Sequence, residues 1–330
     1  MSGLIRSVLG DLPATASLGR CDAHEHVVLG GPFVEANYPE LDLSDTDAAV
    51  VELTDFAEAG GGWIVDAMPT SGARRPDALA EVSRRSGVPI VMSTGRHLAQ
   101  YDPPDDPHRR LDREALAAWM IREIRDGVNG IRCGAIKVAG GRGGLSDDER
   151  EAFIAAAQVQ RETGCPILTH TEADGPGVWD QVRTLLDHGA DASKVVLSHL
   201  DQNTDAALHR DVLASGVCLE YDQHFRRLLK RDTRSPGPFE LIAQVVDSYP
   251  DRVVLGMDLA RRAYWAARGG SPGLTWFLHA LPAGLRSAGL SNAAIDRLFI
   301  DNPIRAFRFA NDSMPDSLSP VRSHDRETRR

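Results

Sequence analysis

Paired cysteines are absent from this 330-residue sequence. It has four cysteines, Cys21, Cys133, Cys165 and Cys218, and none belongs to a CxxC pair. The zinc-ribbon and thioredoxin-like signatures are therefore excluded, and a chain of this length needs no disulfide framework. All four cysteines lie in apolar stretches, so we expect small buried side chains in a protein of the reducing cytoplasm.

Long apolar runs and an excess of positive charge are also missing. The stretch from Met1 to Arg20 is interrupted by Arg6, Asp11 and Pro13, so we expect no secretory signal peptide. No apolar run approaches the ~20 residues of a membrane span. With 37 Lys and Arg against 47 Asp and Glu, the net charge is −10, which argues against binding to nucleic acid or to an anionic membrane.

The sequence instead repeats one pattern, in which a short apolar, β-prone run precedes a longer helical pattern. The runs are Cys21–Val28, Trp63–Met68, Pro89–Thr94, Ile131–Val138, Pro166–Thr171, Val195–Leu200, Val217–Tyr221 and Arg252–Met257. Helical patterns cover Asp47–Glu58, Pro76–Arg85, Arg113–Asp126, Asp147–Glu162, Gly177–His188, Thr204–Ala214, Pro238–Ser248 and a closing region from about Pro272 to Phe309. Strands that alternate with helices predict a parallel sheet.

Capping signals support these elements. Ser146 and Glu149 form a capping box, and Gly164 ends the helical pattern that follows them. Eight β/α units in about 280 residues predict a TIM-type (β/α)8 barrel, as one domain over residues 1–310. A doubly wound open sheet is the alternative, but no GxGxxG follows the first run. The polar stretch 311–330 is expected to be a flexible tail.

Histidines stand where the predicted strands end. The first run contains Asp22-Ala23-His24-Glu25-His26, and the i, i+2 spacing places His24 and His26 on one face of a strand. His170, His199 and Asp258 follow three later runs. Barrel enzymes build their active sites at these carboxyl ends, and a buried imidazole or carboxylate is costly there unless it is paired or metal-bound. The pattern predicts a metal site.

Lys137 lies in the apolar string Gly134-Ala135-Ile136-Lys137-Val138. An unpaired ammonium is rarely buried, and as a cation it would repel a metal ion. Reaction of the neutral amine with carbon dioxide would give a carbamate, which can bridge two cations. A lysine that extends its ammonium to solvent from a strand end is the alternative interpretation.

Together these residues resemble the phosphotriesterase family of the amidohydrolase superfamily. The strings that carry the resemblance are HEH, IRCGAIKVA, PILTHTEAD, VVLSHLD and VVLGMD. Asp301–Phe307 is similar to the family's closing NPxRxF segment, so the likeness extends from about Leu4 to Phe309.

The resemblance implies a hydrolase with two divalent metal ions. The implied ligands are His24, His26 and Asp258 for the more buried ion, His170 and His199 for the more exposed ion, and N6-carboxylated Lys137 with a hydroxide between the two. Asp258 would also accept the proton of the bridging hydroxide, which attacks the substrate. Zinc suits such ligands, and manganese or cobalt could replace it. Asp66 is either a support for the ligands or a structurally paired carboxylate.

Basic residues gather in the loops after the last two strands, a common phosphate site in barrel enzymes. Residues 224–234 contain five Lys and Arg against one Asp. The candidates to bind an anionic group of the substrate are Arg226, Arg227, Arg261 and Arg262, and the alternative is a solvated basic helix face. From their loop positions, His97, Tyr101 and His224 are further candidates to line the pocket.

One departure from the family pattern bears on the substrate. Gln202 and Gln223 stand where organophosphate-degrading members have an acidic residue and a histidine that relay protons, although adjacent His224 could compensate for one. The leading hypothesis is therefore a lactonase that opens a small anionic lactone, a phosphorylated sugar lactone. Phosphotriester or carboxylester hydrolysis at the same site is the alternative, followed by a non-catalytic ligand-binding protein. The resemblance also implies a homodimer.

Overall fold

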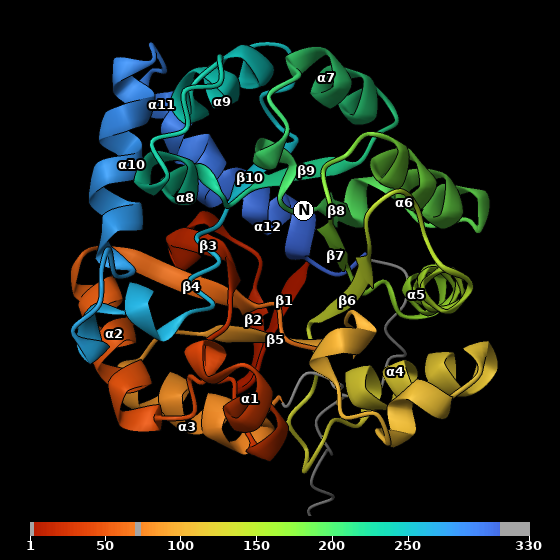
Figure 1. The fold of residues 1–330 in the computed structure, drawn as a ribbon. Coiled ribbons are helices and arrows are strands. Elements are labelled where there is room, and N and C mark those ends of the chain that lie inside the picture. Colours follow the sequence, from red (N-terminus) through yellow and green to blue (C-terminus); the bar gives the residue numbers. More distant parts are fainter. Residues whose placement is uncertain (1–2, 70–73, 311–330) are drawn as a thin grey trace, which may run out of the picture.

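A parallel barrel forms the centre of the molecule (Figure 1). The computed structural model describes residues 3–69 and 74–310. Its eight-stranded sheet runs in sequence order from β3 to β10. The strands are β3 (Arg20–Glu25), β4 (Gly61–Asp66), β5 (Ile90–Arg96), β6 (Ala135–Gly140), β7 (Ile167–Thr171), β8 (Val195–Leu197), β9 (Cys218–Tyr221) and β10 (Val253–Leu255). The chain after β10 returns to β3, where the Asp258 amide donates to the His24 carbonyl at 2.8 Å. The predicted TIM-type barrel is confirmed.

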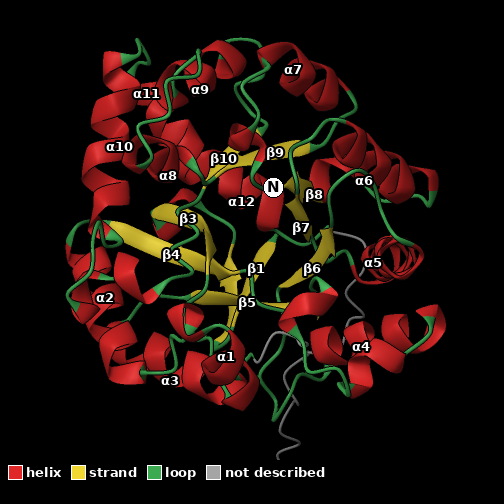
Figure 2. Cartoon of the chain, in the orientation of Figure 1, coloured by secondary structure: helices red, strands yellow, loops and turns green. Residues whose placement is uncertain are grey.

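Helices surround the strands on the outside of the barrel, and one further helix, α12, lies across its end (Figure 2). They are α1 (Pro32–Asn37), α2 (Thr46–Glu58), α3 (Pro76–Ser86), α4 (Arg113–Arg125), α5 (Asp147–Thr163), α6 (Pro176–Asp187), α7 (Ala206–Ala214), α8 (His224–Leu229), α9 (Pro238–Val246), α10 (Thr275–Ser287), α11 (Asn292–Asp296) and α12 (Asn302–Phe307). The capping box at the start of α5 is present, and Gly164 ends that helix with a left-handed φ of 69°. Among the described residues, no helix combines the length and apolarity that crossing a bilayer requires.

The core has two layers, one between strands and helices and one inside the barrel. Phe307 of α12 belongs to the inner layer and packs edge-on against Trp63 of β4, with ring centroids 6.2 Å apart. All four cysteines are buried and unpaired, as the apolar stretches predict. The C-terminal helix therefore closes the end of the barrel opposite the predicted site.

Several short elements differ from the sequence-based expectation. A hairpin of β1 (Leu4–Ser7) and β2 (Gly10–Pro13) precedes the barrel, and α1 and α8 lie within segments that we expected to be loops. Each has only four to six residues, too few to show a hydrophobic period. The strand predicted over Val195–Leu200 ends at Leu197, because the chain turns sharply at His199. The tail predicted for 311–330 lies outside the described residues.

Removal of the Phe307 ring tests the role of α12. Phe307→Ala is expected to lower the free energy of unfolding by about 3–5 kcal/mol, because the ring is fully buried in the inner core layer. Denaturant unfolding followed by circular dichroism measures the change. Leu229→Ala, at a side chain that is 58% exposed, is the control and should cost less than about 0.5 kcal/mol. Equal effects of the two substitutions would contradict the packing described here.

Candidate active site

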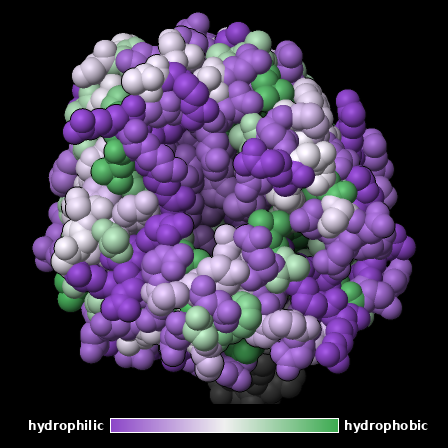
Figure 3. Space-filling model, viewed as in Figure 1, coloured by the Kyte–Doolittle hydropathy of each residue, from purple (hydrophilic) through white to green (hydrophobic). Residues whose placement is uncertain are grey.

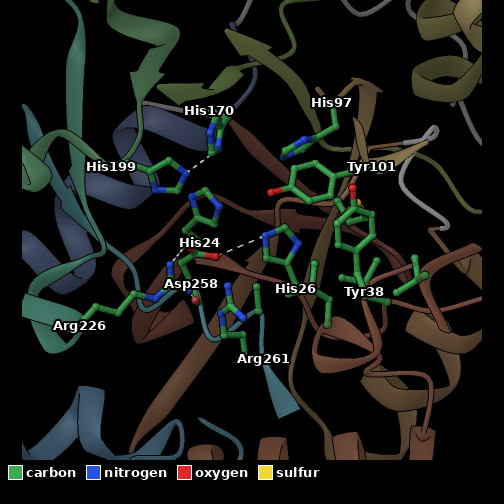
Figure 4. Close-up of a pocket in the computed structure, with 15 residues that line it drawn as sticks. His24, His26, Tyr38, His97, Tyr101, His170, His199, Arg226, Asp258 and Arg261 are labelled. Carbon is green, nitrogen blue, oxygen red and sulfur yellow. Dashed lines mark hydrogen bonds and ion pairs between the residues drawn. The ribbon is translucent and has the colours of Figure 1, made fainter. Parts of the chain in front are cut away.

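The two histidines at the end of β3 face a pocket at the C-terminal mouth of the barrel (Figure 4). The His24 and His26 rings lie 5.6 Å apart, and His26 Nε2 lies 3.4 Å from Asp258 Oδ1. The pocket has a volume of about 140 Å³, and all three residues line it. The i, i+2 spacing in β3 thus places both imidazoles on the side of the barrel where enzymes of this fold carry out chemistry.

His170, His199 and Lys137 complete this group. His199 Nε2 lies 3.0 Å from His170 Nδ1, and the His199 ring lies 4.9 Å from that of His24. Lys137 is fully buried; its Nζ lies 3.5 Å from His24 Nε2 and donates to the Thr169 carbonyl at 2.8 Å. The structure therefore brings together all six residues that the sequence suggested as metal ligands; hereafter we call them the ligand cluster.

Two members of the ligand cluster have a left-handed backbone. The φ angle is 65° at His199 and 48° at Asp258. A non-glycine residue in this region typically costs about 1–3 kcal/mol, and such strain concentrates at functional sites. These turns end β8 and β10 early and direct both side chains inward, which explains why the predicted strands were too long.

Two buried carboxylates, Glu220 in β9 and Asp222 just after it, orient two imidazoles, and sequence reasoning missed both. His24 Nδ1 and Glu220 Oε2 are 2.8 Å apart, and His199 Nδ1 and Asp222 Oδ1 are 2.8 Å apart. An ionised carboxylate can only accept, so when these acids are ionised Nδ1 carries the proton and Nε2 directs its lone pair into the cluster. The signal was present in the string Cys218-Leu219-Glu220-Tyr221-Asp222, where i, i+2 acids share the barrel-facing side of a strand.

Three further carboxylates hold the backbone around the cluster. Asp22 accepts from the amides of His24 and Met257 at 3.2 and 3.1 Å, which joins β3 to the end of β10. Glu25 accepts from the Leu259 amide at 3.1 Å. Asp66 accepts from the amides of Val27 and Met68 at 2.7 and 3.0 Å. Asp66 is thus a structurally paired carboxylate that fixes the chain just after His26.

Burial sets the charge state of the nitrogen donors. It lowers the pKa of Lys137 to about 8 and that of His170 to about 4, and it lowers the pKa of His24 well below its usual value. Burial alone would raise the pKa of Asp258, but Arg226 and the neighbouring imidazoles hold that pKa well below the usual range. The cluster therefore presents neutral imidazoles at His24 and His170, an ionised carboxylate and an amine that loses its proton easily.

This donor set fits divalent metal ions. His24, His26 and Asp258 offer ligand atoms within 4.8 Å of one another, and so do His24, His199 and Asp222. Neutral imidazoles whose other nitrogen donates to a carboxylate are the usual arrangement of metal-binding histidines. The residues present are thus suited to hold metal.

Aromatic residues extend the pocket wall away from the cluster (Figure 4). His97 lies 5.3 Å from His170 and 5.1 Å from Tyr101, measured between ring centroids, and both His97 and Tyr101 line the pocket. Tyr38, which sequence reasoning missed, contacts Tyr101 at 5.3 Å and donates to the Gln100 carbonyl at 2.8 Å. Nothing in the sequence near Tyr38 distinguishes it, because it follows α1, a short helix that was not predicted.

The basic candidates are divided between different environments. Arg226 and Arg261 line the pocket, whereas Arg227, Arg262 and His224 do not. Arg227 is buried and its Nε donates to Asp232 at 3.0 Å, while Arg262 extends to Asp42 at 3.7 Å.

His224 is likewise turned away from the ligand cluster. It is buried and stacks on Trp276 at a centroid distance of 5.5 Å. The sequence places these side chains in the correct loops but cannot show which way each one points.

Arg226 and Gln223 hold the ligand carboxylate Asp258. Gln223 Nε2 donates to Asp258 Oδ2 at 2.8 Å, and Arg226 Nη1 lies 3.0 Å from the same oxygen. Gln223, which stands where organophosphate-degrading members have a proton-relaying residue, therefore acts as a hydrogen-bond donor to Asp258. The loop after β8 carries the acidic residue Asp201. Its side chain is buried and accepts hydrogen bonds from the amides of Asp222 and Gln223 at 3.3 and 2.9 Å.

Comparison with known proteins agrees with this geometry. The sequence profile of the phosphotriesterase family matches residues 4–307. The chain therefore belongs to the phosphotriesterase family, as its motifs predict.

Among its relatives is a phospho-furanose lactonase of Mycoplasmopsis synoviae, 30% identical over 92% of this chain and 91% of that protein. Another is an N-acetyltaurine hydrolase of Salmo salar, 27% identical over 94% of this chain and 99% of that protein. A lactonase structure from Listeria monocytogenes has a TM-score of 0.85 at 24% identity, covering 93% of this chain and 99% of the other, and shares the fold.

The Glu220–His24 contact generates a prediction about metal affinity. Glu220→Gln keeps the size of the side chain but replaces a charge-assisted hydrogen bond, so we expect metal affinity to fall about 10- to 100-fold. Competition with a chelator of known affinity measures it. Glu52→Gln is the matched control, because Glu52 is also buried but accepts from Ala267 and Leu274 amides away from the cluster. Equal affinities in the two variants would contradict an orienting role for Glu220.

Arg226 is expected to affect turnover more than substrate binding. Since its guanidinium contacts Asp258, Arg226→Gln should lower kcat about 10- to 100-fold and change KM less than about threefold. Steady-state kinetics with any ester or lactone that the protein hydrolyses give both constants. A large rise in KM for anionic substrates with kcat unchanged would instead identify Arg226 as a substrate contact.

Proposed function

We propose that this protein is a binuclear-metal lactonase that opens a small anionic lactone. The observation that carries the proposal is the ligand cluster, four imidazoles, a carboxylate and a buried lysine at the mouth of a phosphotriesterase-family barrel. A relative is named a phospho-furanose lactonase, and that name describes a phosphorylated sugar lactone as the substrate class. The chain is a hydrolase of this family, and the lactone is the proposed substrate.

Two divalent ions would be held by His24, His26 and Asp258 and by His170 and His199, with Lys137 between them. Zinc suits these ligands, and manganese or cobalt is compatible with them. Bound there, the ions would make water a nucleophile at neutral pH and polarise the carbonyl of the substrate. Asp258 Oδ1 faces the cluster while Gln223 and Arg226 bind Oδ2, so we assign Asp258 as the acceptor of the water proton.

Lys137 is proposed to be N6-carboxylated. Its amine, with a pKa near 8, can react in its neutral form with carbon dioxide to give a carbamate and a proton. The reaction replaces a buried ammonium by a carbamate anion, between the histidine pair His24 and His26 and the pair His170 and His199. It therefore removes an unfavourable positive charge next to the metal ligands.

Phosphotriester hydrolysis is the second candidate at the same site, because the family contains it. It is less favoured here because Gln202 and Gln223 cannot accept protons and His224 packs against Trp276. The homodimer, the cytoplasmic location and the flexible tail at 311–330 remain predictions, which light scattering, cell fractionation and limited proteolysis would check.

A substrate panel tests the reaction. The zinc- or manganese-loaded protein should hydrolyse phosphorylated sugar lactones at least about tenfold better, in kcat/KM, than their unphosphorylated forms or paraoxon. Asp258→Asn should reduce every activity in the panel by a factor on the order of 100 or more. Paraoxon turnover equal to that of the best lactone would favour the triesterase instead. An Asp258→Asn variant with full activity would contradict the site itself.

Carboxylation of Lys137 has its own test. Lys137→Ala should lose most of its activity and regain part of it when formate or acetate is added, because a small carboxylate can occupy the space of the carbamate. Carbon-13 NMR of the wild-type protein in labelled bicarbonate should show a carbamate signal that is absent from the variant. Full activity of Lys137→Ala without added acid would contradict this assignment.

A further inference from the structure

The imidazole of His170 is turned differently from those of His24 and His199. Its Nδ1 faces the ligand cluster and lies 3.0 Å from His199 Nε2 (Figure 4). His24 and His199 present Nε2 to the cluster instead, because their Nδ1 atoms each lie 2.8 Å from a buried carboxylate oxygen. The outward nitrogen of His170 is therefore Nε2, and a metal-binding histidine normally donates from its outward nitrogen to an acceptor.

This outward nitrogen has no acceptor at hydrogen-bond distance. His170 Nε2 is buried and makes no hydrogen bond with any residue in the part of the chain that the structure describes. Glu172 Oε1 lies 3.7 Å from it, slightly beyond hydrogen-bond distance. A buried N–H without an acceptor is unfavourable, so the position favours a closer approach of the Glu172 carboxylate.

The backbone of His170 is already fixed, so only its ring remains to be positioned. The His170 carbonyl accepts from Gln181 Nε2 at 3.2 Å, and the Gln181 side chain is fully buried. The ring contacts those of His97 and His199 at centroid distances of 5.3 and 4.6 Å. These contacts lie on the pocket side, and a hydrogen bond to Glu172 would fix the outward edge of the ring.

Arg142 holds the other oxygen of the same carboxylate. Its Nη2 donates to Glu172 Oε2 at 3.1 Å, and the Arg142 side chain is 78% exposed. Both residues line a polar cavity of about 630 Å³, which adjoins the metal pocket because Arg226 lines both. Figure 3 shows the hollow in this face, with hydrophilic residues around much of it. Glu172 is itself 30% exposed, so its carboxylate can move between the arginine and the imidazole without disturbing the core.

We propose that Glu172 is a positioning residue for His170 and that Arg142 opposes it. Glu172 accepts a hydrogen bond from His170 Nε2, which fixes the ring with Nδ1 toward the metal site. Arg142 draws the carboxylate away from the ring and adds positive charge near the cation that His170 would hold. The inference rests on the proposed binuclear centre. It assigns the affinity for one of the two ions to a carboxylate and an arginine outside the ligand cluster.

Stepwise zinc affinities test the role of Glu172. Competition with chelators of known affinity gives one dissociation constant for each bound ion. Glu172→Ala should weaken one ion on the order of 100-fold and leave the other within about twofold of wild type, because the carboxylate acts through a single imidazole. Glu172→Gln keeps an oxygen that accepts from His170 Nε2, so its loss should be about tenfold or less. Equal losses in the two variants would show that charge alone acts, and would overturn the positioning role.

The sign of the Arg142 effect separates positioning from a structural ion pair. Arg142→Gln should tighten the same ion about two- to threefold, because it releases Glu172 and removes a nearby positive charge. Loss of a merely structural ion pair would instead weaken binding in Arg142→Gln and Glu172→Ala alike, and that result would contradict the proposal. Glu162→Gln is the matched control, since Glu162 is 43% exposed, pairs with Arg125 at 3.0 Å between α4 and α5, and should change neither constant.

The imidazole proton gives a direct readout of the hydrogen bond. In zinc-loaded protein that carries nitrogen-15-labelled histidine, the Nε2–H of His170 should give a downfield proton signal, assigned by its loss in His170→Asn. The signal should persist in Arg142→Gln and move upfield or disappear in Glu172→Ala. An unchanged signal in Glu172→Ala would show that the two side chains form no hydrogen bond.

The outcomes separate this inference from the proposed function. If the wild-type protein binds two zinc ions and none of the Glu172 and Arg142 variants changes either constant, the positioning role is wrong and the binuclear hydrolase stands. If saturating zinc loads fewer than two ions on the wild-type protein, the binuclear centre itself fails.

Discussion

The hydrogen bonds from His24 and His199 to two buried carboxylates, at the end of β9 and just after it, are the constraint on which the site depends. Glu220 in β9 lies 2.8 Å from His24 Nδ1, and Asp222, just after that strand, lies 2.8 Å from His199 Nδ1 and 3.3 Å from His24 Nδ1. They fix which nitrogen of each ring carries the proton, and the second nitrogen then faces the ligand cluster. Without them the histidines would lie close together, but their lone pairs would have no common direction.

The same region holds more acidic than basic side chains. Asp22, Glu25, Asp66, Glu220 and Asp222 are all fully buried near the mouth of the barrel, whereas the basic side chains among the described residues in contact with the imidazoles or Asp258 are Lys137 and Arg226. Burial raises the pKa of Asp22, Glu25, Asp66 and Glu220, which is the cost of holding acids away from water. Divalent cations in the cluster would offset that cost, so a metal site and a carboxylate-rich barrel mouth support each other.

How far the sequence predicts this molecule depends on the physical origin of each feature. The barrel follows from eight apolar runs with helical patterns between them. The histidines and Asp258 of the ligand cluster follow from polar residues where those runs end, whereas the complete ligand set with Lys137 follows from the resemblance to the phosphotriesterase family. Sequence reasoning missed Glu220 and Asp222 because an acid within or just after a short strand suggests a solvent-exposed position. Only the structure shows that both side chains face the barrel interior and pair with histidines there. The sequence predicted the correct loops for Arg227, Arg262 and His224, but the structure shows that these side chains do not line the pocket. Loop position does not fix the direction of a side chain. Tyr38 directly follows α1, a helix of six residues that is too short for a periodic signal.

The number of metal ions bound per chain is the most direct measurement. Protein equilibrated with zinc or manganese and separated from free metal is analysed by inductively coupled plasma mass spectrometry, beside Lys137→Met. The account predicts two ions per wild-type chain and one or fewer in the variant, with hydrolysis lost as the second ion is lost. One ion or none in a fully active wild-type protein would contradict the claim that buried carboxylates and imidazoles build a binuclear centre here.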